Sequence, residues 1–372
     1  MKNEQTITFL RTSSKPIPRV KRVDYVAAEL GYKSIFVGAR REKDLPDFDT
    51  WDGLAIERVG NYYPMLNGAG LLKYVRGVLS YNYGAYKLLK AKRPNIIHFS
   101  DVESFFAVFI YALFNKVTTL YNIHDNFSQR YPLPSAINSL LNIFEGLIVR
   151  FATATMVPEK FRADALPKFC RKKITVVRNT PVDPGFSPHN GFENKRIKLV
   201  FAGWLDEGRG INTLLRLAEM EPRFEIHIAG EGNKEVIDKI VKFDNCLYHG
   251  FLNHTQVLDL TKDCDFVFAH YSPHRKINIH AAPNKLAESL AVGRPVIINS
   301  ETLVSKPVSQ FSCGIVTPYN DVAHLHKEII ELCENYTEYK SACVNARRFF
   351  EREYSWESVK ESTIKVFDKI EI

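Results

Sequence analysis

The sequence lacks the marks of several common classes of protein. None of its apolar runs approaches the roughly 18 residues that a membrane-spanning helix needs. Residues 1–6 are polar and lead into a short predicted strand, so they do not have the pattern of a secretory signal. The six cysteines include no Cys-x-x-Cys pair, which predicts reduced structural thiols in a cytosolic protein.

Common cofactor and catalytic motifs are missing as well. The first strand-to-helix loop, residues 11–18, has none of the glycines of a dinucleotide fingerprint, which argues against a nicotinamide or flavin site there. The sequence has no Walker phosphate loop and no Gly-x-Ser-x-Gly nucleophile elbow. His270, His274 and His280 share one stretch, but they lack helical spacing and an accompanying Cys or Asp pair. We therefore expect neither a metal nor a bound cofactor.

What the sequence does contain is typical of a soluble globular protein with two domains. Its 372 residues exceed the size of one ordinary core, and 45% of them are apolar while 25% are charged. The formal net charge of +8 favours acidic partners. Nucleotide phosphates, an anionic membrane face and nucleic acid all fit that charge.

Strands and helices alternate along the chain, and the alternation starts twice. In the first half, strands are predicted at 6–10, 34–38, 54–59, 94–101, 117–123, 154–158 and 174–177, with helices at 19–30, 71–91, 103–114 and 136–151. After a linker at 184–196, strands are predicted at 197–203, 224–229, 245–250, 265–269 and 295–298, with helices between them and at 321–336, 339–352 and 356–370. This pattern predicts two successive doubly wound α/β domains.

Two predicted helices of the first half have an unusual composition. Residues 103–114 are nearly all apolar, which predicts a buried helix. Residues 71–91 interleave leucine, valine and tyrosine with Lys73, Arg76 and Lys87. Such a helix either lies on an anionic membrane face or packs on the core with a solvated basic side.

Residues 281–297 combine a helix start, a short helix and a buried strand. Pro283 suits the first turn of a helix, and Gly293 can take the left-handed conformation that ends one. The free N–H groups and the positive dipole end of such a helix attract phosphate. Glu288, one turn further on, could accept hydrogen bonds from ribose hydroxyls. The alternative is an ordinary βα unit with a solvated glutamate.

Two glycine-containing turns come earlier in the second half, each directly after a predicted strand. The first contains Gly203, Arg209 and Gly210, and an arginine at a helix start can pair two oxygens of a diphosphate. The second contains Gly230 and Gly232. Each turn alone could be structural. Because the carboxyl ends of parallel strands meet at one sheet edge, the three candidate contacts together indicate a nucleotide-diphosphate site.

His124 and Asp125 follow the predicted strand 117–123, at the edge where open α/β sheets bind ligands. The histidine could orient a sugar hydroxyl or transfer a proton, with Asp125 fixing its ring. The alternative is a histidine that caps the strand end and bonds to backbone.

Taken together, the second half resembles the retaining nucleotide-sugar glycosyltransferases of family four, of the bacterial surface-polysaccharide type. The motifs that carry the resemblance are Phe201-Ala202-Gly203, Arg209-Gly210, Ile228-Ala229-Gly230-Glu231-Gly232, His249-Gly250-Phe251, the stretch 283–297 and Tyr354-Ser355-Trp356-Glu357. The resemblance implies the GT-B fold, in which two Rossmann-like domains face each other across a cleft. It predicts an acceptor domain at 1–183, a linker at 184–196, a nucleotide-sugar domain at 197–355 and a final helix, 356–372, that packs back on the first domain.

The resemblance also implies roles for residues at matching positions. Arg209 would bind the donor diphosphate and Glu288 the ribose. The backbone around Asn284, Lys285 and Leu286 would meet the phosphate.

Further positions match the family in part. Phe251 and Leu252 would lie against the base, and His124 matches a histidine close to the transferred sugar. His280 stands where the family has the first glutamate of a pair, and Trp204 stands where an arginine is frequent. The missing arginine removes one phosphate contact.

The function implied is transfer of a hexose, with retention and without a metal, from a UDP- or GDP-sugar to an acceptor hydroxyl. The acceptor would be a lipid-linked glycan in capsule, lipopolysaccharide O-antigen or exopolysaccharide synthesis, at the cytoplasmic face of the inner membrane, where peripheral contact with anionic lipid is an option. No nucleic acid partner is expected. Two alternatives stay open: a sugar-nucleotide epimerase of the same fold, and a non-enzymatic basic protein that binds membrane or nucleic acid.

Overall fold

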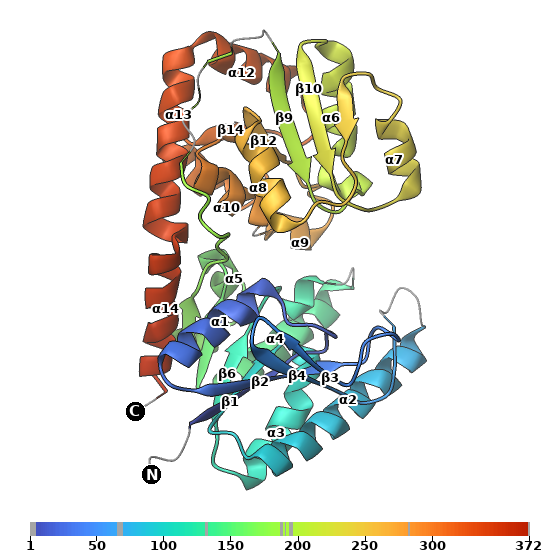
Figure 1. Ribbon diagram of the computed structural model, residues 1–372, viewed down its shortest axis with the longest axis vertical. Coiled ribbons are helices and arrows are strands. Elements are labelled where there is room, and N and C mark those ends of the chain that lie inside the picture. Colours follow the sequence, from blue (N-terminus) through green and yellow to red (C-terminus); the bar gives the residue numbers. More distant parts are fainter. Residues whose placement is uncertain are drawn as a thin grey trace. The chain divides into compact units, whose positions relative to one another are not determined.

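The computed structural model describes residues 5–64, 70–130, 133–186, 189, 191–192, 196–281 and 283–370. It divides into two compact units, the first formed by Met1–Val177 with Lys360–Ile372 and the second by Arg178–Val359. Each unit is a β-sheet of parallel or mostly parallel strands with helices packed on it (Figure 1). The predicted fold class, two Rossmann-like α/β domains, is therefore confirmed.

The first unit is built on an eight-stranded sheet with the order β3-β4-β2-β1-β5-β6-β7-β8. The strands are β1 (Thr6–Leu10), β2 (Lys33–Ala39), β3 (Phe48–Trp51), β4 (Leu54–Val59), β5 (Ile96–Ser100), β6 (Thr118–Asn122), β7 (Ala154–Val157) and β8 (Ile174–Val176). All neighbours are parallel except the β3–β4 hairpin. The strand order reverses between β1 and β5, so the loops after these two strands part at the carboxyl edge of the sheet.

Helices cover both faces of this sheet. They are α1 (Pro18–Glu29), α2 (Leu71–Lys92), α3 (Phe105–Phe114), α4 (Ser135–Phe151) and the short α5 (Lys160–Asp164). Right-handed crossovers put α1 on one face and α2, α3 and α4 on the other, and Figure 1 shows α1 and α3 on opposite sides of the strands.

The prediction that residues 103–114 form a buried helix is wrong for one side of that helix. The helix exists as α3, and one side of it, with Phe105, Val108 and Tyr111, packs into the core. The opposite side is apolar but exposed, and Phe114 retains 77% of its accessible surface. An all-apolar composition conceals which side of a helix faces the sheet.

The last helix, α14 (Trp356–Asp368), begins in the second unit and ends in the first. Its later part is integral to the first unit, because Val366 and Phe367 are buried there. The Phe367 ring lies 5.7 Å from the ring of Tyr32, and Lys360 Nζ lies 2.6 Å from Glu29 Oε2.

The second unit is a six-stranded, fully parallel sheet with the order β11-β10-β9-β12-β13-β14. Its strands are β9 (Ile197–Ala202), β10 (Phe224–Ala229), β11 (Cys246–Tyr248), β12 (Phe266–Ala269), β13 (Val296–Asn299) and β14 (Gly314–Thr317). Its helices are α6 (Ile211–Met220), α7 (Lys234–Ile240), α8 (His254–Lys262), α9 (Lys276–Ile279), α10 (Asn284–Val292), α11 (Ser305–Gln310), α12 (Val322–Glu334) and α13 (Tyr336–Phe349). The order reverses between β9 and β12, which is the position where open α/β sheets bind ligands.

Within the described ranges, none of the helices combines the length and the apolar character that crossing a bilayer requires.

Candidate active site

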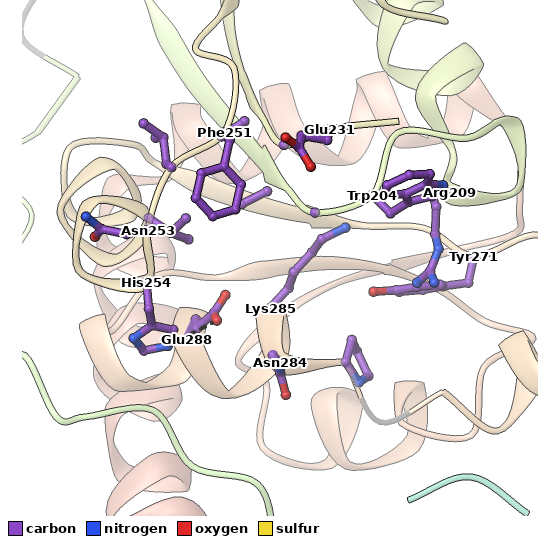
Figure 2. Close-up of a pocket in the computed structure, with 17 residues that line it drawn as sticks. Trp204, Arg209, Glu231, Phe251, Asn253, His254, Tyr271, Asn284, Lys285 and Glu288 are labelled. Atoms are coloured by element: carbon purple, nitrogen blue, oxygen red, sulfur yellow. Dashed lines mark ion pairs between the residues drawn. The ribbon is translucent and has the colours of Figure 1, made fainter. Parts of the chain in front are cut away.

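The second unit contains a cavity of about 530 Å³ at the carboxyl edge of its sheet (Figure 2). Loops after four strands line it: Gly203 and Trp204 follow β9, Gly230 follows β10, Phe251 follows β11 and Tyr271 follows β12. The start of α10 closes it from another side. The cavity therefore lies at the reversal point of the strand order.

Close backbone packing holds the first two of these loops together. The Gly203 N–H donates to the Ala229 carbonyl at 2.9 Å, and the Leu205 N–H donates to the Glu231 carbonyl at 2.8 Å. Gly230 has a φ of +135°, and a Cβ atom there would lie 1.9 Å from the carbonyl oxygen of Gly203. Only glycine fits at that position. The glycine-containing turn after β10, which suggested a phosphate contact in the sequence, is therefore needed to build this wall of the cavity.

Helix α10 presents its first turn to the cavity. Pro283 precedes the helix with an extended backbone (φ −72°, ψ 133°), and Asn284 and Lys285 form its first turn. The first amide groups of a helix have no partner within it, and the helix dipole makes this end positive. Together with a cavity this provides an anion site.

Lys285 is the most strongly perturbed cation of the cavity. Its Nζ lies 3.4 Å from the ring centroid of Phe201, and Gly203 packs against the end of its side chain. Burial lowers the pKa of Lys285 well below its usual value, and the nearby Arg209 guanidinium lowers it further, although Glu288 acts in the opposite direction. An anionic ligand would restore the charged form, because an opposite charge close to the amine favours the ammonium.

Arg209 reaches the cavity from a short 3-10 turn, Glu207–Arg209, at the start of α6. Its guanidinium carbon lies 5.1 Å from the ring centroid of Tyr271, a distance typical of cation–π contact. Burial raises the pKa of Tyr271 to about 12, although Arg209 opposes this. The phenol is therefore neutral at physiological pH and can donate a hydrogen bond.

Glu288 and His254 face each other at the end of the cavity opposite Arg209, as Figure 2 shows. His254 Nε2 lies 3.4 Å from Glu288 Oε1. The imidazole is half exposed, whereas the carboxylate is nearly buried. His254 is the first residue of α8, whose start is fixed by a capping box between Asn253 and Gln256. Glu288 is thus a nearly buried hydrogen-bond acceptor at this end of the cavity, which suits hydroxyl groups of a ligand.

Two family models match consecutive parts of the chain. The model for glycosyl transferases group 1 matches residues 185–349, which include the whole cavity, and the model for glycosyltransferase family 4 matches residues 27–184. The chain is a GT-B glycosyltransferase. No curated protein sequence matches it at a significant level.

Solved structures share the fold of this glycosyltransferase over its whole length. Sucrose-phosphate synthase from Thermosynechococcus elongatus is 15% identical, with a TM-score of 0.77 and 98% of each chain covered. HepE from Anabaena, solved in complex with UDP-glucose, is 12% identical, with a TM-score of 0.70 and coverage of 98% of this chain and 99% of HepE. The lipopolysaccharide outer core galactosyltransferase WaaB is 11% identical, with a TM-score of 0.66 and coverage of 98% and 99%.

Most of the donor-binding residues that the sequence suggested lie together in the glycosyltransferase. The cavity is lined by Gly203, Arg209, Gly230, Phe251, Leu252, Asn284, Lys285 and Glu288. Four candidates do not line it. Gly210 packs on His270 and Gly232 on Leu205, the Leu286 side chain is buried, and His280 Nδ1 lies 3.2 Å from the Lys276 carbonyl oxygen. The binding role of all twelve stays a prediction.

Sequence reasoning missed several polar side chains that line the cavity, among them Tyr271, Asn253 and His254. Tyr271 follows β12 without a motif, and Asn253 and His254 belong to the start of α8. The pattern of an N-cap followed three residues later by glutamine marks that helix start in the sequence. It does not show that the histidine turns toward Glu288.

The two catalytic candidates of the first unit lie beside a buried charge cluster. Asp101, after β5, pairs with Arg11, after β1, at 3.1 Å and also with Arg130. His124 follows β6 close to this cluster, whereas Asp125 pairs with Arg162 at 2.8 Å. The carboxylate that influences the pKa of His124 is therefore Asp101 and not its sequence neighbour.

His124 is a neutral imidazole at physiological pH. Burial lowers its pKa well below the ordinary value, and although Asp101 raises the pKa, Arg11 lowers it again. Its Nε2 atom is buried and has no hydrogen-bond partner among the described residues. A neutral imidazole with an open ring nitrogen suits hydrogen bonding to a sugar hydroxyl.

Proposed function

We propose that this glycosyltransferase transfers a hexose from a UDP-sugar to an acceptor hydroxyl with retention of the anomeric configuration. The observation that carries the proposal is the cavity at the strand reversal of the second unit, where Arg209, Lys285 and the amide end of α10 converge. The complex of HepE with UDP-glucose supports UDP as the nucleotide, because that protein shares the fold. The resemblance to family four supports retention.

The cations would act by stabilising the leaving group. Cleavage of the sugar–phosphate bond leaves the negative charge on UDP, and Arg209, protonated Lys285 and the first amides of α10 stabilise that charge. Glu288 accepts hydrogen bonds from the ribose hydroxyls. With its neutral ring, His124 would bond to a hydroxyl of the transferred sugar, while Asp125 is held in an ion pair with Arg162.

We further propose that the acceptor is a lipid-linked glycan of surface-polysaccharide assembly, at the cytoplasmic face of the inner membrane. The fold shared with the lipopolysaccharide galactosyltransferase WaaB supports this choice. So does the basic net charge of +8.

A ligand screen tests the donor proposal. UDP-sugars at a hundred times their dissociation constant are expected to stabilise the protein by about 2.7 kcal/mol, measured as a shift of the thermal midpoint, while GDP- and ADP-sugars stabilise it less. Transfer from the stabilising UDP-sugar should proceed at the same rate with EDTA, since protein cations replace the metal. Stabilisation by a GDP- or ADP-sugar instead would contradict the choice of nucleotide.

UDP binding is also expected to take up a proton. The pKa of Lys285 lies well below its usual value in the empty cavity, and a bound diphosphate raises it again. Between these two pKa values the amine is neutral before binding and charged after it. Calorimetry in two buffers of different ionisation enthalpy, repeated as the pH is raised toward 10, should show the uptake. It should vanish in Lys285→Met and persist in the control variant Lys234→Met, whose exposed amine lies on α7 outside the cavity.

A further inference from the structure

Three consecutive helices of the first unit expose apolar side chains to solvent. On α3 these are Phe106, Phe109, Ile110, Leu113 and Phe114, with 38–77% of their surface accessible. Their spacing along the sequence places them on one side of the helix. A stripe of this kind normally packs into a core, so its exposure indicates an interaction surface.

Helices α2 and α4 continue this surface. The exposed apolar residues are Leu71, Leu72, Val75, Leu79 and Tyr83 on α2, and Ile137, Leu140, Ile143 and Leu147 on α4. With those of α3 they account for 14 of the 28 large apolar side chains that are exposed among the described residues. We name the outer side of these three helices the α2–α4 face.

The three helices lie side by side, so the exposed stripes adjoin one another. The Asn82 side chain of α2 donates to the Glu103 carbonyl and accepts from the Ala107 N–H of α3, both at 2.8 Å. On the other side of α3, the ring of Phe109 lies 5.6 Å from that of Phe151 on α4. The α2–α4 face is therefore one continuous layer.

The charges on this layer have one sign. The three helices, all within the described part of the chain, carry exposed cations at Lys73, Arg76, Lys87, Lys90, Lys92 and Arg150. Their single acidic residue, Glu145, is fully buried and accepts hydrogen bonds from the Phe127 N–H and the Tyr121 hydroxyl. Apolar side chains interleaved with cations, with no exposed carboxylate among them, match the boundary of an anionic bilayer.

We propose that the α2–α4 face docks on a lipid bilayer with anionic headgroups, inserting the apolar stripes of α2, α3 and α4 among the acyl chains. This inference rests on the proposed lipid-linked acceptor and identifies the surface that brings the enzyme to it. Lys87 lies 4.5 Å from the ring centroid of Tyr83, so aromatic and cation share the headgroup level.

The charges disfavour a second copy of the chain as the occupant. In a two-fold dimer the same face meets itself, so Lys73, Arg76 and Lys87 of both copies would approach one another. Because no exposed carboxylate lies on these helices to neutralise them, that contact would be repulsive. Anionic lipid neutralises the same charges.

Vesicle sedimentation of the full-length protein tests the proposal. The protein should bind phosphatidylcholine vesicles containing 30% phosphatidylglycerol in preference to pure phosphatidylcholine. The double variant Leu113→Gln/Phe114→Gln should lose about tenfold or more of its vesicle affinity. Lys73→Glu/Arg76→Glu should lose roughly fivefold for each cation removed.

Matched controls lie in the second unit. Met220→Gln/Val241→Gln and Lys234→Glu/Lys242→Glu also change exposed residues and should keep wild-type vesicle affinity. Equal binding to both vesicle types, or unchanged binding of both α2–α4 variants, overturns the proposal. The proposal is also overturned if the wild type is a dimer in analytical ultracentrifugation and Leu113→Gln/Phe114→Gln converts it to a monomer.

Nucleotide binding separates this inference from the proposed function. All four variants should show the same UDP-dependent thermal shift as the wild type, because none of the changed residues lines the cavity. Vesicle binding without any response to nucleotide sugars would support the docking face and overturn the donor proposal. A response to UDP-sugars without vesicle binding would support the donor proposal and overturn the docking face.

Discussion

The substitution Gly230→Ala is expected to lower the free energy of unfolding by about 3–5 kcal/mol. The new methyl group would lie 1.9 Å from the Gly203 carbonyl oxygen, which is backbone and cannot rotate away. The residue must also hold a φ of +135°, a conformation that side chains rarely adopt. The loops after β9 and β10 would have to separate, which breaks the hydrogen bond from the Gly203 N–H to the Ala229 carbonyl. Urea unfolding curves measure the loss.

A neighbouring glycine provides the control for this experiment. Gly250 follows β11 at the same sheet edge and also has a positive φ, +66°, but no atom of the described residues lies within 4 Å of a Cβ placed there. The variant Gly250→Ala should therefore cost only about 1–2 kcal/mol, the ordinary penalty of a left-handed residue. Equal losses of unfolding free energy in the two variants would show that the close approach of the two loops does not contribute to stability.

The substitution Arg209→Ala is expected to reduce kcat by roughly 10²- to 10³-fold. In our proposal this guanidinium stabilises the charge that develops on UDP as the sugar leaves. Lys285 already contributes to this stabilisation in our proposal, so it cannot replace the missing guanidinium. Initial rates of UDP release at saturating donor measure the effect.

A matched arginine separates this role from a general effect of charge. Arg216 lies on α6, which follows the Arg209 turn, and is exposed; its Nη1 lies 3.5 Å from Asn320 Oδ1. Arg216→Ala should retain wild-type kcat and donor affinity. A wild-type kcat for Arg209→Ala would remove this residue from the transfer step, while a changed KM alone would restrict it to ground-state binding.

The fold could be predicted because the strands of parallel sheets are buried on both faces and so form short apolar runs. The strands β3 and β14 were both missed. For β3 the sequence carries a hairpin signal, because Asp52 and Gly53, both with positive φ, form its turn. Its residues are mostly exposed, so no apolar run marks it. The orientation of α3 could not be predicted, since its sequence is apolar on every side.

The cavity was predictable where backbone conformation decides the residue type. Gly203 and Gly230 mark loops with a positive φ, and Pro283 marks the start of α10. Each of these features depends on the local sequence, so it can be recognised there. Tyr271 and His254 enter the cavity through the packing of separate loops, and no local pattern encodes that convergence. For the same reason the nearest charged partners of His124 could not be read from its neighbour Asp125.

The helix that ends in the first unit imposes an order on biosynthesis. Residues 178–359 form a continuous segment, so the second unit has its full complement of residues as soon as Val359 has left the ribosome. The first unit, whose strands are translated earlier, lacks Val366 and Phe367 at that moment and exposes the ring of Tyr32. The unit that begins first is thus completed last, and a nascent chain arrested after Val359 would carry one finished domain and one open core.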